Sequence, residues 1–434
     1  MTTNDVFGRN LSTWLHEDAE HHVPDHLADV LQRTAVTRQR PAWSSLERWL
    51  PMDTTLRPRL VTLPPGGRLL LVAGLLIALA LLAIFAVGSW QSRLPDPFGL
   101  ARNGLIVTSR DGDIYLIDKA TTESRLIAGG EEGFDFSPIF SRDGTRMVFL
   151  RSDGPLPETG PAVLTLFVAK ADGTEPRALT PPTKALDWFD WSPDGASIAY
   201  MSRGGLYVVD VDEGKPRQVK GTGTMHFPTW LPPVGKDIVY RLESQANPGI
   251  YAIAADGSGE RRLLSMTPPN NEFDYQGIAV SPDGSKVTFT RWLSDVPDVE
   301  ANGWLPRVFA LDVKTGKEVP FPTPDGTGQH RGVYSPDGKL VAYARIYRTG
   351  GFQIVVANAD GSGNERTIGP RKPGRPDGSD VQATWAFTPD GTALMVRYGD
   401  DAKGTTHLMP LDGSASTDLG SGGFEFVDIQ RLAP

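Results

Sequence analysis

The pattern of hydrophobic and polar residues divides the chain into two unlike parts. Residues 69–87 read LLLVAGLLIALALLAIFAV, a run of nineteen residues without a charge or a polar side chain. From residue 104 onward, short apolar runs alternate with polar residues and are separated by turns rich in Gly, Pro and Asp. The first pattern is typical of a membrane-spanning helix, and the second is typical of short, half-buried β-strands.

The apolar run has the length that a bilayer requires. At about 1.5 Å per residue the helix spans roughly 28 Å, close to the ~30 Å hydrocarbon core. Arg68 at one end and Trp90 and Arg93 at the other can reach the membrane interfaces. A buried core helix is the alternative, and a cleaved signal peptide would be shorter and lie nearer residue 1. We therefore predict a membrane anchor at 69–87.

The arginines around this run predict its orientation. Four precede it closely and two follow it, namely Arg48, Arg57, Arg59 and Arg68 before, and Arg93 and Arg102 after. The positive-inside rule then places residues 1–68 in the cytoplasm and residues 88–434 in the periplasm or at the cell surface. Residues 88–103, with three residues that are Pro or Gly between 95 and 99, are expected to form a linker.

A short motif recurs through the second part of the chain. Six copies stand 39 to 54 residues apart, beginning at Ser141 (SRDG), Ser192 (SPDG), Leu231 (degenerate, LPPVGK), Ser281 (SPDG), Ser335 (SPDG) and Thr388 (TPDG). An aromatic residue precedes five of them, and each is followed by two β-rich runs and a short final strand. In such a motif Pro presets φ, Asp bonds its own backbone, and Gly accepts a positive φ. We interpret the motif as a hairpin turn, and call it the turn box.

Four short strands per repeat of this length are typical of the blades of a β-propeller. Residues 104–127 resemble the second to fourth strands of a blade, and residues 423–430 resemble a first strand with nothing after it. Joining the two termini in one blade closes the ring and removes open sheet edges. We predict an all-β, seven-bladed propeller over residues 104–434, or a six-bladed one if the degenerate repeat at Leu231 merges with a neighbour.

The turn boxes, with strands such as IAY at 198–200 and YVVD at 207–210, resemble the TolB-like, WD40-like (PD40) propellers of bacterial envelopes. They also resemble the N-terminal propeller of dipeptidyl-peptidase IV-type enzymes. The resemblance covers about residues 104–430 and implies the fold, but propellers carry many functions. The hydrolase comparison lacks support, because no Gly-x-Ser-x-Gly elbow occurs in the sequence.

Residues 1–68 are polar and contain two helical patches, one from Pro24 to Leu31 and one over 44–50. The second has an apolar stripe that fits either the bilayer surface or a cytoplasmic protein partner. A small inner segment, one span and an outer domain resemble the layout of membrane-bound anti-sigma factors. The sequence has no Cys, which excludes their Cys-containing zinc site. A cluster of His16, His21, His22 and His26 is conceivable as a metal site, but a solvated turn is favoured.

Charge and composition exclude several functions. The net charge is −9, and residues 1–68 are neutral, so the acidic excess lies in the later part of the chain. An acidic bulk argues against nucleic acid as a partner. Asp-rich turns at 256 and 360 need no Ca²⁺ to form, and no catalytic triad can be assigned from the seven His. We therefore expect no catalytic residue, no metal, no cofactor and no enzymatic activity.

Propeller geometry suggests where a ligand would bind. The innermost strand of each blade starts at one mouth of the central channel, so residues about five positions before each turn box should surround that mouth. These candidate ligand-binding residues are Asp135, Asp187, His226, Gln276, His330, Arg331 and Gln382. Solvated loop residues are the alternative interpretation.

Three classes of function remain open. The first is a membrane-anchored module that binds a protein, peptide or glycan outside the cytoplasm. The second is a transmembrane regulator in which binding outside alters what residues 1–68 hold inside. The third is a propeller hydrolase or lactonase. The first fits every feature and is our expectation, with the second as the alternative.

Overall fold

The computed structural model describes residues 76, 96, 98–117, 124–128, 133–157, 161–221, 223–243, 246–266, 277–292, 305–375, 381, 383–399, 404–421 and 427–433. The chain forms two compact units, Met1–Ser89 and Trp90–Pro434. Of the first unit the structure describes only Leu76, which is helical. The predicted helices of residues 1–68, the His cluster and the rest of the 69–87 span lie outside the described residues. Among the residues that are described, no helix has the length and apolar character to cross a membrane.

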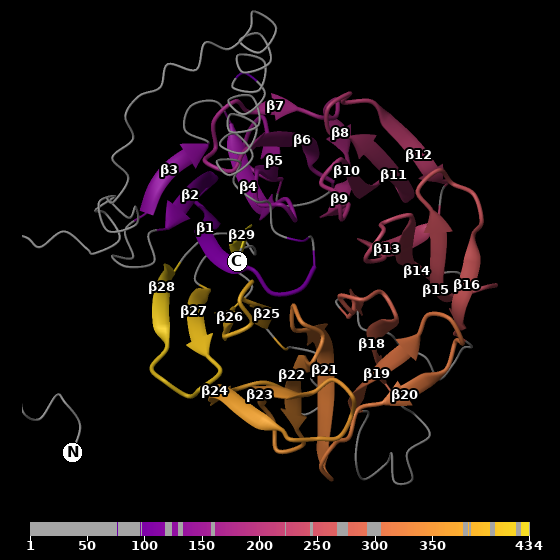
Figure 1. Cartoon of the computed structure of the whole chain (residues 1–434), viewed down its shortest axis with the longest axis vertical. Coiled ribbons are helices and arrows are strands. Elements are labelled where there is room, and N and C mark those ends of the chain that lie inside the picture. Colours follow the sequence, from indigo (N-terminus) through magenta and orange to yellow (C-terminus); the bar gives the residue numbers. More distant parts are fainter. Residues whose placement is uncertain are drawn as a thin grey trace, which may run out of the picture. The chain divides into compact units, whose positions relative to one another are not determined.

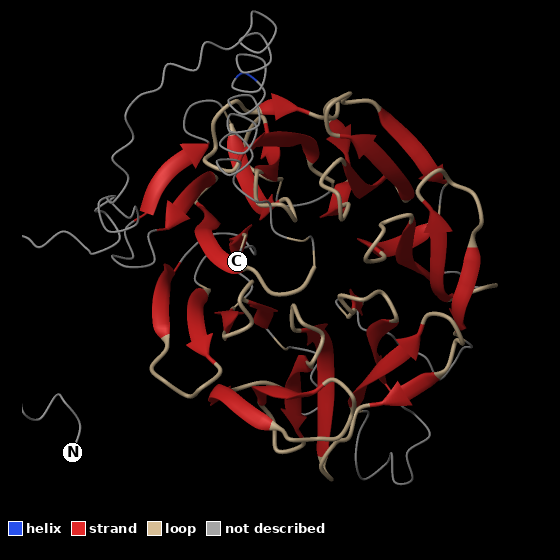
Figure 2. Ribbon diagram, viewed as in Figure 1, coloured by secondary structure: helices blue, strands red, loops and turns tan. Residues whose placement is uncertain are grey.

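The described part of the second unit consists of strands joined by turns, and its sheets stand as blades around a common centre (Figures 1 and 2). Blade 1 contains β29 (Val427–Leu432), β1 (Arg102–Arg110), β2 (Asp113–Ile117) and β3 (Ser124–Ala128). Blade 2 contains β4 (Phe134–Phe140), β5 (Arg146–Ser152), β6 (Val163–Lys170) and β7 (Arg177–Ala178), with β8 (Thr183–Lys184) also paired to β6. Blade 3 contains β9 (Leu186–Trp191), β10 (Ser197–Ser202), β11 (Gly205–Asp210) and β12 (Pro216–Lys220).

The remaining four blades repeat this order. Blade 4 contains β13 (Thr224–Trp230), β14 (Asp237–Glu243), β15 (Gly249–Ala254) and β16 (Arg261–Ser265). Blade 5 contains β17 (Ala279–Val280), β18 (Lys286–Trp292), β19 (Pro306–Asp312) and β20 (Glu318–Pro320). Blade 6 contains β21 (Thr327–Tyr334), β22 (Leu340–Tyr347), β23 (Phe352–Asn358) and β24 (Arg366–Lys372). Blade 7 contains β25 (Ala383–Phe387), β26 (Ala393–Tyr398), β27 (Thr405–Pro410) and β28 (Thr417–Ser421). The prediction of seven blades is confirmed, and the degenerate box at Leu231 belongs to a blade of its own.

Blade 1 closes the ring with strands from both ends of the propeller. The C-terminal β29 pairs antiparallel with β1, and Ile106 lies opposite Ile429 in the register. These two side chains belong to one buried cluster with residues of blade 7, including Met395. The predicted joining of the two ends is therefore confirmed. The pairing also covers the edge of β1 that would otherwise be open to another chain.

The position of a strand in its blade decides its hydrophobic pattern. The two middle strands of a blade pack against neighbouring blades on both faces, so they are almost continuously apolar, as in β26, where every residue is buried. The outermost strands face solvent, and the first three residues of β12 are exposed. The main buried clusters join adjacent blades, for example blades 6 and 7 around Ile354, Trp385 and Val396. The hydrophobic core is thus distributed between the blades around the ring.

The turn boxes are hairpin turns, as predicted from their sequence. In the box of blade 5, the Ser281 hydroxyl donates to the Asp283 carboxylate at 2.6 Å and accepts the Lys286 backbone N–H at 2.9 Å. The Gly284 N–H donates to the Ser281 carbonyl, and Gly284 has φ +70°. The other three Ser boxes and the Thr388 box repeat the hydroxyl–carboxylate bond at 2.6–2.7 Å. Each box thereby satisfies its polar groups locally without an ion.

Candidate functional site: the central cavity

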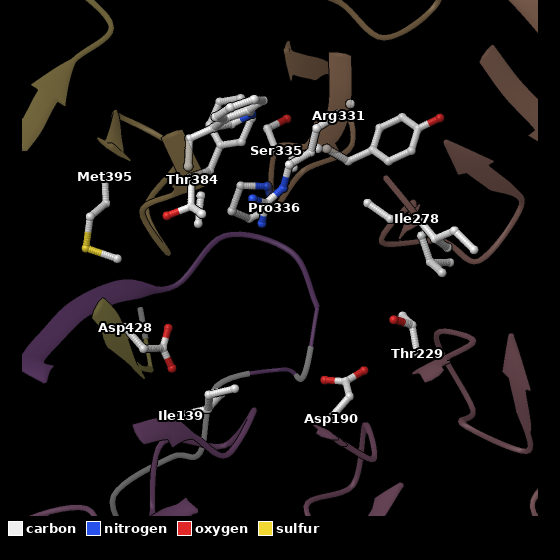
Figure 3. Close-up of a pocket in the computed structure, with 18 of the residues that line it drawn as sticks. Ile139, Asp190, Thr229, Ile278, Arg331, Ser335, Pro336, Thr384, Met395 and Asp428 are labelled. Atoms are coloured by element: carbon white, nitrogen blue, oxygen red, sulfur yellow. The ribbon is translucent and has the colours of Figure 1, made fainter. Parts of the chain in front are cut away.

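A cavity of about 830 Å³ lies at the centre of the ring, between the innermost strands and the turn boxes. Figure 3 shows side chains from several blades facing it, among them Asp190, Thr229, Arg331, Thr384 and Asp428. The prolines of the turn boxes also line it, so this cavity lies toward the turn-box end of the central channel. Its volume is in the range of pockets that bind small molecules or short peptide segments.

Aromatic side chains form much of the cavity wall. Trp188 and Phe227 have their ring centroids 4.3 Å apart, and Trp230 and Trp385 also line the space. Trp230, the aromatic residue that precedes the box of blade 4, donates its indole N–H to the Asp190 carbonyl of blade 3 at 3.1 Å. Trp191 makes the equivalent bond to Ile139 of blade 2. In blades 3 and 4, the tryptophan before the turn box therefore fixes neighbouring inner strands to each other.

The charged residues of the cavity give it an excess of positive charge. Its charged lining residues are four arginines and two aspartates, namely Arg142, Arg331, Arg397, Arg431, Asp190 and Asp428. The whole protein carries a net charge of −9, so the cavity has the opposite sign to the molecule. In a partly desolvated space such charges act more strongly than on the surface.

Both aspartates are held by bonds within the protein. The Asp190 carboxylate accepts the Trp230 backbone N–H at 3.2 Å and lies 3.5 Å from Arg142. The Asp428 carboxylate accepts the backbone N–H groups of Phe140 and Ile429 at 2.8 and 2.9 Å. Burial raises the pKa of both carboxyls, and these bonds, together with the nearby Arg142, oppose that rise.

Arg431 is also shifted by its position. Burial and the neighbouring Arg142 lower its pKa to about 10, against the attraction of Asp428. Its guanidinium is therefore still protonated at neutral pH, and it remains a hydrogen-bond donor. Arg331 adopts a positive φ of +53°, and its guanidinium lies 5.4 Å from the Trp385 ring centroid.

A segment of the chain itself enters this cavity. Phe98 and Gly99 line it, and Figure 3 shows the trace that leads into β1 crossing the space. The Nη2 group of Arg431 donates hydrogen bonds to the carbonyl oxygens of Asp96 and Gly99, each at 2.9 Å. The Arg142 guanidinium lies 5.2 Å from the Phe98 ring centroid. We call residues 96–99, of which the structure describes Asp96, Phe98 and Gly99, the tether, because in the sequence they lie between the predicted membrane span and β1.

The structure places the sequence-predicted candidates in different surroundings. Arg331 lines the cavity, whereas Asp135, His226 and His330 do not contribute to its lining. Asp135 is fully buried and forms a two-pronged ion pair with Arg151, with both N–O distances 2.7 Å. His226 lies 3.5 Å from Glu243 on the adjacent strand, and His330 is buried.

The other candidates are less fully described. The Asp187 backbone pairs with Met201 in blade 3, while Gln276 and Gln382 lie outside the described residues. Ligand binding by the seven predicted residues stays a prediction. Asp135 has a complete structural role in its bond to Arg151, which requires no ligand.

Sequence reasoning missed the charged residues at the turn-box end of the channel. Arg142 was visible as the one departure from proline in the second position of a Ser- or Thr-led box. Asp190 stands between two aromatic residues in WFDW at 188–191, at a position that a buried inner strand would fill with an apolar residue. Asp428 and Arg431 gave no such signal, because only ring closure brings them beside Arg142.

The fold and the cavity define the class of this protein: a seven-bladed β-propeller with a positively charged, aromatic-lined central cavity. Residues 157–426 match the family model described as the TolB β-propeller domain, PD40, over more than half of the chain. The chain belongs to this family. No curated protein sequence matches it significantly.

Solved structures share this fold at low sequence identity. The oligogalacturonate lyase of Vibrio parahaemolyticus is similar with a TM-score of 0.55 and 12% identity, over 74% of this chain and 90% of the lyase. A structure from an analysis of two prolyl endopeptidases is similar with a TM-score of 0.52 and 12% identity, over 84% of this chain and 56% of the endopeptidase chain. TolB from Acinetobacter baumannii has a TM-score of 0.47 and 17% identity, over 77% of this chain and 81% of TolB.

These neighbours contradict our expectation that the protein is not an enzyme. A lyase and two endopeptidases share the propeller, and a puromycin hydrolase is similar with a TM-score of 0.50. The absence of a recognisable motif therefore does not exclude catalysis for this fold. At 12–14% identity the likeness shows the fold alone and assigns no reaction to this chain.

The described residues contain no cluster of side chains that could coordinate a metal ion. No group of three or more His, Cys, Asp or Glu side chains comes together there with the spacing of a metal site. Asp190 and Asp428, the acidic residues of the cavity, instead use their carboxylate oxygens on backbone N–H groups of the neighbouring blade.

Proposed function

We propose that this protein is a membrane-anchored propeller whose central cavity binds a segment of a partner protein outside the cytoplasm. The single observation that carries the proposal is the cavity of about 830 Å³, in which an aromatic wall and four arginines face a common space. Aromatic residues and Arg are the side chains that contribute most to protein–protein recognition. Membership of the TolB β-propeller family supports a role in protein binding.

Anchoring and location rest on the sequence. The 69–87 run supplies the anchor, and the arginine distribution places the propeller in the periplasm or at the cell surface. In this arrangement residues 1–68 face the cytoplasm and can hold a second protein partner. A glycan is the alternative ligand at the propeller, and its binding would not depend on a protein partner.

A transmembrane regulator is the second candidate, and the tether favours it. The Asp96 and Gly99 carbonyls are bonded to Arg431, which lines the cavity, and only eight residues separate Asp96 from Val87 at the end of the predicted span. A partner that changes the cavity thus acts at a point of the chain that is close in sequence to the end of the predicted span. The 68 residues before the span exceed what an anchor needs.

The test is affinity capture of the tagged full-length protein from native membranes, with one variant that fills the cavity. Thr229 lines the cavity, so Thr229→Trp should exclude a ligand from it. Thr367 is exposed on the outer strand β24, so Thr367→Trp adds the same bulk elsewhere. We expect a partner that is captured by the wild type and by Thr367→Trp and is lost, by about tenfold or more, with Thr229→Trp.

The outcomes separate the candidates. Equal capture of the same proteins by both Trp variants would contradict binding in the cavity. A partner lost only when residues 1–68 are removed would favour the transmembrane regulator. A glycan would be the ligand if Thr229→Trp lost no captured protein but abolished binding to a glycan array.

A further inference from the structure

Phe98 and Gly99 of the tether line the cavity, and together with Asp96 they make contacts of the kind that a bound peptide makes. The tether's backbone carbonyls at Asp96 and Gly99 accept two hydrogen bonds from one arginine, and its aromatic ring lies under another arginine. Hydrogen bonds to the main chain of a peptide, combined with a pocket for a side chain, are a recurring means of recognising an extended peptide. A guanidinium within about 6 Å of an aromatic centroid is attracted to the ring.

The tether is attached to the propeller without being part of a blade. Ala101, immediately after it, donates its backbone N–H to Pro389 in the turn box of blade 7 at 2.9 Å. Phe98 and Gly99 are only half-buried, and Leu100 beyond them is 52% exposed. The tether therefore adds little to the hydrophobic core, and its release would leave the seven blades in place.

The arginines that hold the tether retain further binding capacity. The Nε of Arg431 is buried and has no hydrogen-bond partner within the described part of the chain. Arg142 stands between Asp190, at 3.5 Å, and the Phe98 ring. The cavity also has four arginines against two aspartates, so an added carboxylate is favourable there.

We propose that the tether is an internal ligand of the Arg142–Arg431 subsite, and that a partner peptide with an acidic residue two positions before an aromatic one binds by displacing it. This inference rests on the proposed function, and it names both the chemistry of the partner and the way in which binding is regulated. The tether itself supplies the pattern, since its sequence is Asp-Pro-Phe-Gly at 96–99. Being joined to the chain, it competes at a high effective concentration and weakens the apparent affinity of any peptide added from outside.

Displacement would connect the cavity to the predicted span. Once the tether leaves, residues 96–99 add about four residues of free length to the chain between Val87 and Ala101, which stays bonded to Pro389. Partner binding thus lengthens the connection between the propeller and the membrane anchor. No change within the blades is required for this.

The experiment uses the full-length protein in detergent and a fluorescent peptide of its own residues 92–100, SRLPDPFGL. Binding is followed by fluorescence anisotropy. Phe98→Ala removes the ring under Arg142, so we expect the variant to bind the peptide about tenfold more tightly than the wild type. Adding Arg142→Ala to Phe98→Ala should abolish that gain. Leu126→Ala, at an exposed residue of β3 that lies outside the cavity, is the control and should bind as the wild type does.

Equal peptide affinity of the wild type and Phe98→Ala would overturn the proposal, as would a gain that survives Arg142→Ala. Thermal melting of each variant establishes that the propeller is folded. The peptide assay needs no partner, so its result is independent of the capture experiment with Thr229→Trp. Tight peptide binding without a cavity-dependent partner would leave the tether as an internal ligand and contradict only the proposed function.

Discussion

Single glycines in the turn boxes connect one blade to the next. A Cβ added to Gly284 in blade 5 would stand 1.9 Å from the Pro232 carbonyl oxygen of blade 4. A Cβ on Gly144 would meet the Arg431 carbonyl oxygen of blade 1 at 2.0 Å. Gly195 has a similar φ of +67°, but its Cβ would find only the Asp143 side chain, at 3.7 Å. The same residue type thus serves the turn alone in one blade, and both the turn and the contact between blades in another.

This difference predicts unequal effects of one substitution. Substitution of Gly284 or Gly195 by Ala puts a Cβ on a residue with positive φ, which destabilises the folded state by about 1 kcal/mol. Gly284→Ala also forces blades 4 and 5 apart, so we expect it to lower the free energy of unfolding by about 1–3 kcal/mol more than Gly195→Ala does. Urea unfolding of both variants measures the difference. Equal losses would mean that the close approach at Pro232 is relieved without cost.

The residues of the cavity illustrate the limit of sequence reasoning at this scale. The turn box could be interpreted from its four residues, because each one has a local reason to be there. Asp428 and Arg142 come together only because β29 lies beside β4 around the closed ring, and no local pattern encodes that. Burial of Asp135 against Arg151 is likewise a result of packing, and it explains why a polar residue in the expected place need not face the channel.

At the scale of elements, β29 connects parts of the chain that are far apart in sequence. It pairs with β1 across 325 positions of sequence, as in the bond from the Leu105 backbone N–H to the Gln430 side chain. Gln430 also donates to the Gly144 carbonyl of blade 2 at 2.6 Å. One short strand thus joins the two ends of the propeller and contacts the next blade.

Removal of the one buried apolar side chain of β29 should therefore destabilise the ring. Ile429 is 6% exposed and packs against blades 1 and 7, so we expect Ile429→Ala to lower the free energy of unfolding by about 2–4 kcal/mol. Leu105, on the paired strand β1, is 38% exposed, and Leu105→Ala should stay within about 0.5 kcal/mol of the wild type. Thermal or urea unfolding checks both. A loss below 1 kcal/mol for Ile429→Ala would show that the closure contributes little to stability.

At the scale of the whole molecule, the proposed orientation predicts which unit can be labelled from outside the cytoplasm. The chain contains no Cys, so a single introduced thiol can report its location without background. Leu126 is 47% exposed on the outer strand β3 and tolerates such a change, while Ser44 belongs to the N-terminal segment.

If the propeller is outside the cytoplasm, Leu126→Cys in intact cells should react with a membrane-impermeant maleimide that can reach the outer face of the cytoplasmic membrane. Ser44→Cys should then react only after the membrane is permeabilised, because the positive-inside rule assigns the arginine-rich side of the predicted span to the cytoplasm. Gel-shift labelling of the two variants measures both. The reverse pattern would invert the orientation, and labelling of both without permeabilisation would contradict the membrane span.

The sequence by itself determined the order and type of the blades and limited their number to seven or six, because turn chemistry and strand periodicity are local properties that recur in every repeat. It also determined that the two ends share a blade, since an unpaired first strand and a blade without one fit only each other. The tertiary structure alone decided which polar residues meet at the centre. Arg142, Asp190, Asp428 and Arg431 come from three different blades, and the tether reaches them from outside the blades. Their meeting depends on the geometry of the closed ring, which no single segment contains.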